Sequence, residues 1–281
     1  AGQRLLEVVG GVKIQRNITS LARPVDILVA TPGRALDLLG QGVLDFSDVK
    51  VVAIDEADQM ADMGFLPQVT KLLDRMPERT QHLLFSATLD GDVQVLVDKY
   101  MRDPVTHSTG EATASVDTMN HLLGVVESRE ERNELVVAIG KLRQRTVMFM
   151  RTKYAVDRQV KKLVRAGVPA VGIHGNKGQN SRQSALDGFT EGKSSVLVAT
   201  DIAARGIDVK DVELVVHIDP PAEHKAYVHR AGRTARAGAS GTVVTLTFAD
   251  AQHDTEKMMA KAGVHPTVLP GAKLIAALRK S

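Results

Sequence analysis

The residues best suited to chemistry are Asp55, Glu56 and Asp58, which stand directly after the apolar run 51–54. A pair of carboxylates at the tip of a buried strand suits nucleotide hydrolysis. Asp55 would hold Mg²⁺ through its water molecules, while Glu56 would orient or deprotonate the attacking water. The alternative interpretation is a solvated acidic turn at the end of a strand.

A second group of residues is basic and lies in the segment 229–236, which reads HRAGRTAR. Arg230, Arg233 and Arg236 recur at intervals of three residues, so one continuous helix would place them along one side. Three like charges this close together are unfavourable unless an anion faces them. The spacing therefore favours an anion-binding role, and a solvated basic helix face is the alternative.

The elements that must position these groups alternate between apolar runs and amphipathic stretches of helical length, as in parallel sheets covered by helices. The runs predicted as strands are 5–9, 26–30, 49–54, 82–85, 120–126, 146–150, 170–173, 195–199, 212–218 and 242–248. Because these runs are rich in Val, Ile and Leu without alternation, we expect both faces of the strands to be covered. Helices are expected between them, for example over 153–166 and 181–190. Polar segments follow the strands directly, where open α/β sheets bind ligands.

The composition of the 281-residue chain, 43% hydrophobic and 25% charged, suffices for two domains of ordinary size. No apolar run approaches the roughly 18 to 20 residues of a membrane span, and the first residues lack the zones of a signal peptide. We therefore expect a soluble, cytoplasmic protein without a membrane partner. Because the sequence has no cysteine, any metal must bind through oxygen or imidazole ligands.

The charge balance is mildly basic, with a formal net charge of +3, which suits a polyanionic partner. The chain has no Trp, 3 Tyr and 6 Phe, so it is poorly supplied with rings on which bases could stack. We expect any nucleic acid to be held by its phosphates and sugars, without sequence-specific readout. No pattern in the sequence predicts an oligomeric state.

A series of short motifs occurs along nearly the whole chain in the order typical of superfamily-2 helicases. They are VVGG (8–11), TPGR (31–34), DEAD (55–58), SAT (86–88), FMRTK (149–153), HGNKGQNSR (174–182), ATDIAARGIDV (199–209) and HRAGRTAR (229–236). Each motif is weak alone, but together they resemble the DEAD-box ATP-dependent RNA helicases, with a core of bacterial type. Asp58, where the related DEAH type has His, separates the two groups.

The resemblance implies an α/β fold of two tandem RecA-like domains with parallel sheets, the first of them incomplete. We expect a partial N-terminal helicase domain over 1–107, a linker over 108–117, a C-terminal helicase domain over 118–265 and a tail over 266–281. The implied cofactors are ATP and Mg²⁺, the latter on Asp55. The implied partner is RNA, single-stranded or in short duplexes, bound through its backbone.

The family's site residues can be carried over position by position. The resemblance assigns catalysis to Asp55, Glu56, Asp58, Ser86, Thr88, His229, Arg233 and Arg236. It assigns nucleotide binding to Asp208, Arg230, Arg233 and Arg236, with Asp208 at the ribose and Arg233 and Arg236 as arginine fingers. It assigns RNA binding to Gly10, Gly11, Thr31, Arg34, Gly175, Gln179, Arg182, Thr200 and Arg205.

Several assignments have simpler alternatives. We expect Ser86 and Thr88 to hydrogen-bond Asp58, although a Ser–Thr pair that caps the next helix would look the same. TPGR also suits a helix start, because Pro is favoured in the first turn. His229 is expected to orient its neighbours rather than to transfer protons. Ala235 stands where the family most often has Gly.

The phosphate-binding loop GxxxxGK[ST] is absent from the printed sequence, and we therefore expect an N-terminally truncated chain. The segment 188–194, GFTEGKS, is one residue short and precedes a strand instead of following one, so we interpret it as a turn. Without the loop's lysine and amides, the nucleotide loses its main anchor, and the chain alone should hydrolyse little ATP. We also expect residues 1–107 to be weakly stable and 118–265 to fold independently. The alternatives to a helicase are a non-catalytic RNA-binding fragment and a DNA translocase of the same superfamily.

Overall fold

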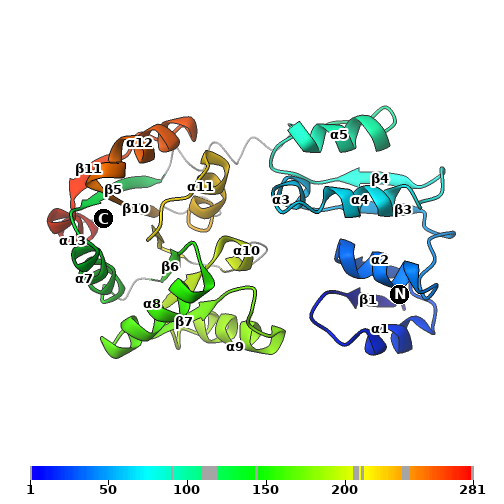
Figure 1. Cartoon of the computed structure of the whole chain (residues 1–281), viewed down its shortest axis with the longest axis horizontal. Helices are drawn as coiled ribbons and strands as arrows, with labels where there is room; N and C mark the ends of the chain where they lie inside the picture. Colours follow the sequence, from blue (N-terminus) through cyan, green and yellow to red (C-terminus); the bar gives the residue numbers. More distant parts are fainter. Residues whose placement is uncertain are drawn as a thin grey trace. The chain divides into compact units, whose positions relative to one another are not determined.

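The computed structural model describes residues 2–89, 91–108, 119–142, 145–204, 209, 212–235 and 241–279. The chain divides into two compact units, Ala1–Ser108 and Thr109–Ser281. Both units combine parallel strands with helices, as expected (Figure 1). None of the helices in the described ranges combines the length and apolar character needed to cross a membrane.

The first unit contains two separate two-stranded parallel sheets. Its strands are β1 (Leu5–Val8) paired with β2 (Ile27–Ala30), and β3 (Val51–Ile54) paired with β4 (Gln81–Leu84). Its helices are α1 (Ile14–Leu21), α2 (Pro32–Gly40), α3 (Ala57–Asp62), α4 (Leu66–Leu73) and α5 (Gly91–Tyr100). A small core of Ile54, Ala57, Val69, Leu73, Val93 and Leu96 packs one side of β3 against α3, α4 and α5.

The other face of these short sheets is open to solvent. Leu5 is 62% exposed, Val51 51% and Phe85 55%, and Ile27 and Val29 are also exposed. The prediction that both faces of the strands are covered is therefore wrong for this unit. The apolar runs have the composition of buried parallel strands, yet in the described chain they lack the layer that would bury them.

The second unit is built on one seven-stranded sheet whose described pairs are all parallel, in the order β11-β5-β10-β9-β6-β8-β7. The strands are β5 (Asn120–Val126), β6 (Thr146–Phe149), β7 (Ala170–Ile173), β8 (Val196–Ala199), β9 (Leu214–His217), β10 (Thr242–Phe248) and β11 (Thr267–Pro270). The helices are α7 (Arg129–Gly140), α8 (Lys153–Arg165), α9 (Gln179–Thr190), α10 (Asp201–Ala204), α11 (His224–Ala231), α12 (Gln252–Lys261) and α13 (Gly271–Leu278), with a short 3-10 helix, η2 (Ala249–Ala251).

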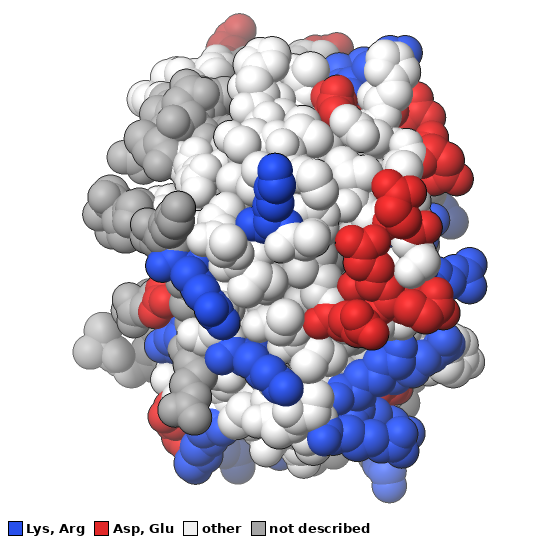
Figure 2. All heavy atoms as spheres, turned by 90° about the vertical axis from the view of Figure 1, so that its left-hand side faces the viewer, with Lys and Arg blue, Asp and Glu red and all other residues white. Residues whose placement is uncertain are grey.

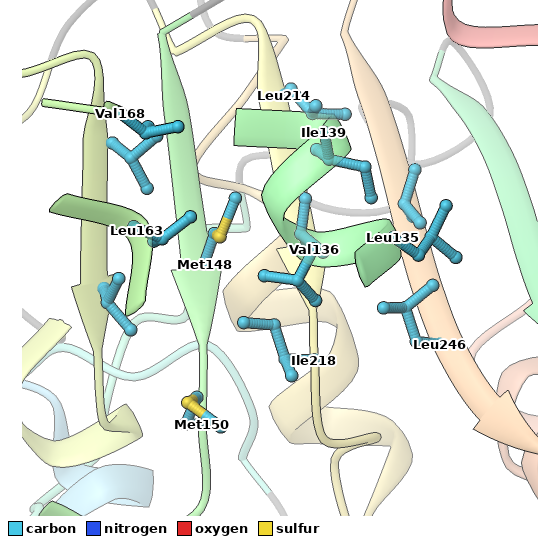
Figure 3. Packing of buried hydrophobic residues seen from close by; sticks show 14 of the residues in the cluster. Leu135, Val136, Ile139, Met148, Met150, Leu163, Val168, Leu214, Ile218 and Leu246 are labelled. Atoms are coloured by element: carbon cyan, nitrogen blue, oxygen red, sulfur yellow. The ribbon is translucent and has the colours of Figure 1, made fainter. Parts of the chain in front are cut away.

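This sheet has an apolar core on each of its two faces, so the prediction of two-sided burial is confirmed here. Every residue of β6, β8 and β9 is buried. In the core shown in Figure 3, Val136 and Ile139 of α7 lie near Met148 of β6, Ile218 beyond β9 and Leu246 of β10. The opposite core includes Phe149, Phe189 and Tyr227.

The segment 266–281 differs from the tail that the sequence predicted. Residues 267–270 form β11, which pairs with β5, and α13 buries Leu274 and Leu278 in the core beside it. Gly124 of β5 permits this contact, since a Cβ there would lie 3.0 Å from a methyl carbon of Leu274. The described end of the chain is therefore an integral part of the second unit.

Candidate functional site

The acidic motif lies at the carboxyl end of β3, where the strand turns into α3. Asp55 and Glu56 are both exposed, and the Glu56 amide donates a hydrogen bond to Oδ1 of Asp55 at 2.9 Å. Glu56 has φ 49° and ψ 50°, a left-handed conformation that a residue with a side chain adopts at a cost of about 1–3 kcal/mol. This turn places two carboxylates side by side at the open end of the strand.

Asp58 differs from its two acidic neighbours because it is buried, at 7% exposure. Its backbone amide donates to Oγ of Ser86 at 3.2 Å, and that hydroxyl donates to the Thr88 carbonyl at 2.6 Å. Ser86 therefore links the acidic motif to the segment after β4. The expected Thr88 hydroxyl bond to Asp58 is wrong, since that hydroxyl is buried without a hydrogen-bond partner among the described residues.

The predicted RNA-binding residues of the first unit shape one loop between β1 and α1. The Gly10 amide donates to Oγ1 of Thr31 at 3.3 Å, and Gly11 has a φ of 82° that favours glycine. Arg34 is half-buried, and its guanidinium donates to the Asn17 side chain and, at 2.8 Å, to the Val12 carbonyl. The structure thus brings Gly10, Gly11, Thr31 and Arg34 together. The guanidinium of Arg34 holds the loop through its hydrogen bond to the Val12 carbonyl.

Arg230 is the most tightly held of the predicted basic residues. It is 4% exposed; its Nε and Nη2 donate to the two carboxylate oxygens of Asp201 at 2.5 and 2.7 Å, and Nη1 donates to the Asp219 carbonyl at 2.8 Å. These bonds use three of the five N–H donors of the guanidinium, so the assignment of Arg230 to the nucleotide stays a prediction. The bonds join Arg230 to the start of α10 and to the segment after β9.

Arg230 and Arg233 do not lie on one helix, contrary to the prediction from their spacing. The helix α11 ends at Ala231 and Gly232 caps it, so Arg233 lies beyond the helix and only Arg230 lies within it. Nevertheless, His229, Arg230 and Arg233 line the same small pocket, together with Phe149, Asp201, Ala204 and Ala226. The pocket lies where β6, α10 and α11 meet. Arg236 and Asp208, predicted for the same site, lie outside the described residues.

The remaining predicted RNA contacts lie at the carboxyl ends of β7 and β8. Gly175 is exposed just after β7, and the Thr200 carbonyl accepts the amides of Ala203 and Ala204 at 3.1 and 3.0 Å, which begins α10. Arg182 of α9 donates to the Ala203 carbonyl at 3.4 Å, so α9 is tied to the start of α10. Gln179 begins α9, but its side chain lies outside the described residues, as does Arg205.

Two acidic residues that received no role from the sequence hold this edge together. Asp157 of α8 accepts from Nε2 of His174 at 3.1 Å, and Asp219 accepts from Nη1 of Arg132 at 3.1 Å and from the Arg151 amide at 3.0 Å. Asp157 and Asp219 lie far along the chain from the residues they hold. In the sequence, the one indication of these contacts was that two of the residues held, His174 and Arg151, lie within the recognised motifs.

Charge on the second unit is mixed on the face that Figure 2 shows. Acidic side chains gather on one flank of that face and basic side chains gather below them, while the largely uncharged middle carries separate basic side chains (Figure 2). The helix α7 carries Glu130 and Glu131, whereas α8 carries Lys161 and Lys162. A polyanion favours a surface of one sign. The strand ends carry Arg151, Lys153 and Lys177 together with the acidic residues Asp157 and Asp219.

Comparisons with known families and proteins agree with this arrangement. A DEAD/DEAH box helicase model matches residues 1–96, and a helicase conserved C-terminal domain model matches residues 131–238. The chain is 41% identical to the ATP-dependent RNA helicase DBP2 of Candida albicans over 244 residues, 85% of this chain and 43% of the relative. The chain thus spans about half the length of the curated relatives it matches. Because these relatives are fungal, the bacterial type of the core stays a prediction.

Solved structures lead to the same family. Dbp5 of Saccharomyces cerevisiae bound to RNA and ADP BeF3 is 25% identical, with a TM-score of 0.86 over 100% of this chain and 74% of that one. A DEAD box protein from the hyperthermophile Methanococcus jannaschii is 30% identical, with a TM-score of 0.53 over 95% of this chain and 72% of that one. The two RecA-like folds, the order of the motifs and these relatives agree. The chain belongs to the DEAD-box helicase family.

Proposed function

We propose that this chain is part of an ATP-dependent RNA helicase, which couples ATP binding and hydrolysis to the local separation of RNA duplexes. The observation that carries the proposal is the acidic end of β3. There Asp55 and Glu56 are open to solvent, while Asp58 is buried and its amide is bonded to Ser86. One motif therefore offers carboxylates for a nucleotide and a direct link to the next strand end.

Asp55 and Glu56 fit a Mg²⁺–nucleotide complex. Across the described parts of the chain, no three His, Asp or Glu side chains converge into a complete metal cage. Two exposed carboxylates suit Mg²⁺ all the same, because this ion keeps several waters and takes further ligands from substrate phosphates. When bound, it would neutralise charge on the phosphates. Asp55 would hold the ion's waters, and Glu56 would orient the attacking water.

The second unit would supply positive charge to a nucleotide. Arg233 and Arg236 would contact the γ-phosphate, a role worth about 10³- to 10⁵-fold in rate in other nucleotide hydrolases. His229 would orient the pocket, and Asp208 would contact the ribose. The bonds of Arg230 to Asp201 fix the end of α11 that leads to Arg233.

RNA would be held by its backbone at the strand ends. In the first unit, the loop of Gly10 and Gly11, held by Thr31 and Arg34, would contact phosphate at the exposed Gly11. In the second unit, the corresponding contacts would come from Gly175, Gln179, Arg182, Thr200 and Arg205. Such contacts carry no sequence information, so the binding would be tolerant of sequence.

The 281 residues alone should hydrolyse little ATP, because they contain no GxxxxGK[ST] loop to hold the phosphates. ATP turnover by the purified chain, with and without RNA, tests this expectation. The matched control is Glu56→Gln, which keeps the size of the side chain but removes its charge. RNA-stimulated turnover by the chain that Glu56→Gln abolishes would overturn the expectation. Turnover that Glu56→Gln leaves unchanged would indicate a contaminating enzyme.

A non-catalytic RNA-binding module remains the second candidate, favoured by the same missing loop. A longer protein that contains the loop and this sequence would hydrolyse ATP on RNA if the first proposal is right. A DNA translocase is the third candidate. It is tested by comparing RNA and DNA of one sequence, since contacts to sugar 2′-hydroxyls favour RNA.

A further inference from the structure

Tyr154 is the most exposed aromatic residue of the chain. Of the 3 Tyr and 6 Phe, it is 70% exposed and Phe85 is 55% exposed, while the rest are buried or half-buried. Phe85 follows β4 in the first unit, where one face of the strands is uncovered. Tyr154 has a different setting, because the second unit around it has complete cores on both sides of its sheet.

Tyr154 stands in the first turn of α8, directly after the end of β6. The Thr152 hydroxyl caps this helix by accepting the Ala155 amide at 3.2 Å, which fixes the turn that carries the ring. Lys153 Nζ lies 5.2 Å from the centre of the Tyr154 ring, and Arg151 and Arg158 nearby are exposed. The Tyr154 ring is therefore presented to solvent beside the ammonium group of Lys153, in a segment that has two further exposed cations.

The same helix turn is tied to the loop after β7. Asp157 lies three residues beyond Tyr154, a spacing that places two side chains on the same side of a helix. Asp157 holds His174 at 3.1 Å, and His174 directly precedes Gly175. Lys177 of this loop approaches Asp157 at 4.0 Å. Tyr154 thus lies three residues along α8 from Asp157, which contacts the loop that the proposed function places against RNA.

We propose that Tyr154 is a stacking platform for one base of a single-stranded RNA whose backbone passes the loop at Gly175. This inference rests on the proposed RNA binding and adds to it a contact with a base. Every base offers a flat face, so stacking is compatible with tolerance of sequence. Lys153 and Arg151 would lie close enough to the ring to meet the flanking phosphates. The small number of aromatic residues led the sequence analysis to expect backbone contacts alone, and this one ring departs from that expectation.

The first test compares affinities for two probes, a fluorescein-labelled uridine decamer and a decamer of the same backbone without bases. Tyr154→Ala should weaken binding of the uridine decamer by about 5- to 100-fold, the range of one lost stack, and should leave the baseless probe unaffected. Tyr154→Phe, which keeps the ring, should bind within about twofold of the parent chain. Because the side chain is exposed, neither variant should change thermal stability appreciably.

The second test uses fluorescence, because the chain contains no Trp. Tyr154→Trp introduces a single indole, whose emission should be quenched as the uridine decamer saturates the protein. The matched control is Val164→Trp, near the other end of α8 at a residue that is 54% exposed, where no quenching is expected. Equal quenching in both variants would contradict stacking at residue 154.

Failure of this inference can be told apart from failure of the proposed function. If the parent chain binds neither probe, the proposed RNA binding is wrong and the stacking contact falls with it. If the parent chain binds the uridine decamer and Tyr154→Ala binds it equally well, the stacking contact alone is wrong. A ring that instead serves a protein partner would give this second outcome. Loss of affinity for both probes in Tyr154→Ala would also overturn the inference, since it would indicate a backbone contact.

Discussion

Arg230 and Asp201 form a two-pronged ion pair, with Nε 2.5 Å from Oδ1 and Nη2 2.7 Å from Oδ2. The guanidinium also lies 5.1 Å from the centre of the Phe149 ring and donates to the Asp219 carbonyl. This single side chain joins the start of α10, the end of β6 and the last turn of α11. The ion pair of Arg230 and Asp201 therefore helps to fix the end of α11, and with it the positions of His229 and Arg233.

Breaking this pair should destabilise the second unit. Removing one partner leaves a poorly solvated charge, and for Asp201→Ala we expect a loss of about 3 kcal/mol in the free energy of unfolding. Arg230→Lys should restore little of the interaction, since an ammonium group cannot bind both carboxylate oxygens in the same geometry. Urea unfolding followed by circular dichroism measures the change.

The control for this prediction is the ion pair of Lys193 and Glu191, whose side chains are 76% and 54% exposed. Glu191→Ala should change the free energy of unfolding by less than about 1 kcal/mol, because water screens an exposed pair. Equal effects of Asp201→Ala and Glu191→Ala would contradict the positioning role of Arg230.

Gly172 of β7 should tolerate no side chain, because α8 lies directly against it. A Cβ there would lie 2.8 Å from one methyl carbon of Val160 and 3.0 Å from one of Val156. We expect Gly172→Ala to lower the free energy of unfolding by about 1–3 kcal/mol through overpacking. Gly188→Ala is the control, since Gly188 lies within α9 in open space. It should raise stability by about 0.5–1 kcal/mol through helix propensity, and thermal melts of both variants test the contrast.

His217 should make the second unit lose stability as the pH falls. Burial lowers the pKa of His217 well below its ordinary value, and the charge of Arg230 and the nearby His121 act in the same direction. Below about pH 6.5 this residue becomes protonated in the unfolded chain, whereas it stays neutral in the folded chain. Stability from this group is therefore complete above pH 6.5 and declines below it, by up to about 1.4 kcal/mol per pH unit.

Replacement of His217 tests this pH dependence. His217→Gln keeps a polar side chain beside Thr245 but does not titrate, so the decline in stability between pH 6.5 and 5 should become shallower. His253→Gln, at an exposed residue of α12, should leave the decline as in the parent chain. Unchanged slopes in both variants would show that other groups govern the acid sensitivity.

Amide hydrogen exchange should separate the two units. The strands β1 to β4 pair only two by two and have an exposed face, whereas β6, β8 and β9 lie inside a seven-stranded sheet. We expect amides of the first set to exchange at least about 100-fold faster than those of the second, because local opening exposes little additional surface. Equal protection in both sets would refute weak stability of the first unit.

Most strands could be predicted from the sequence, because a strand that is buried on both faces needs a continuous run of Val, Ile and Leu, and such a run can be recognised locally. The prediction missed β11, which is short, mostly exposed and ends at Pro270, and which is a strand because β5 offers it an open edge. The helix that was predicted to carry the arginines ends at Ala231, before Arg233. A spacing of three residues says where side chains lie in a helix but not where the helix ends.

The site residues were assigned from motifs, whereas the residues that hold them could not be predicted from the sequence. Asp201 meets Arg230 across 29 positions and Asp157 meets His174 across 17, so no local pattern connects them. At Ala235 the sequence alone did indicate a local feature of the structure. Ala235 stands where the family most often has Gly, and its φ of 53° is in the region that glycine favours.

RNA binding by the chain, measured as a function of salt, tests the central claim most directly. Fluorescence anisotropy with a single-stranded RNA and with DNA of the same sequence gives both affinities over a range of salt concentrations. We predict tighter binding of RNA, with a log–log salt slope of roughly −0.7 for each phosphate neutralised. Absence of saturable RNA binding at low salt, or an affinity that does not change with salt, would contradict the account.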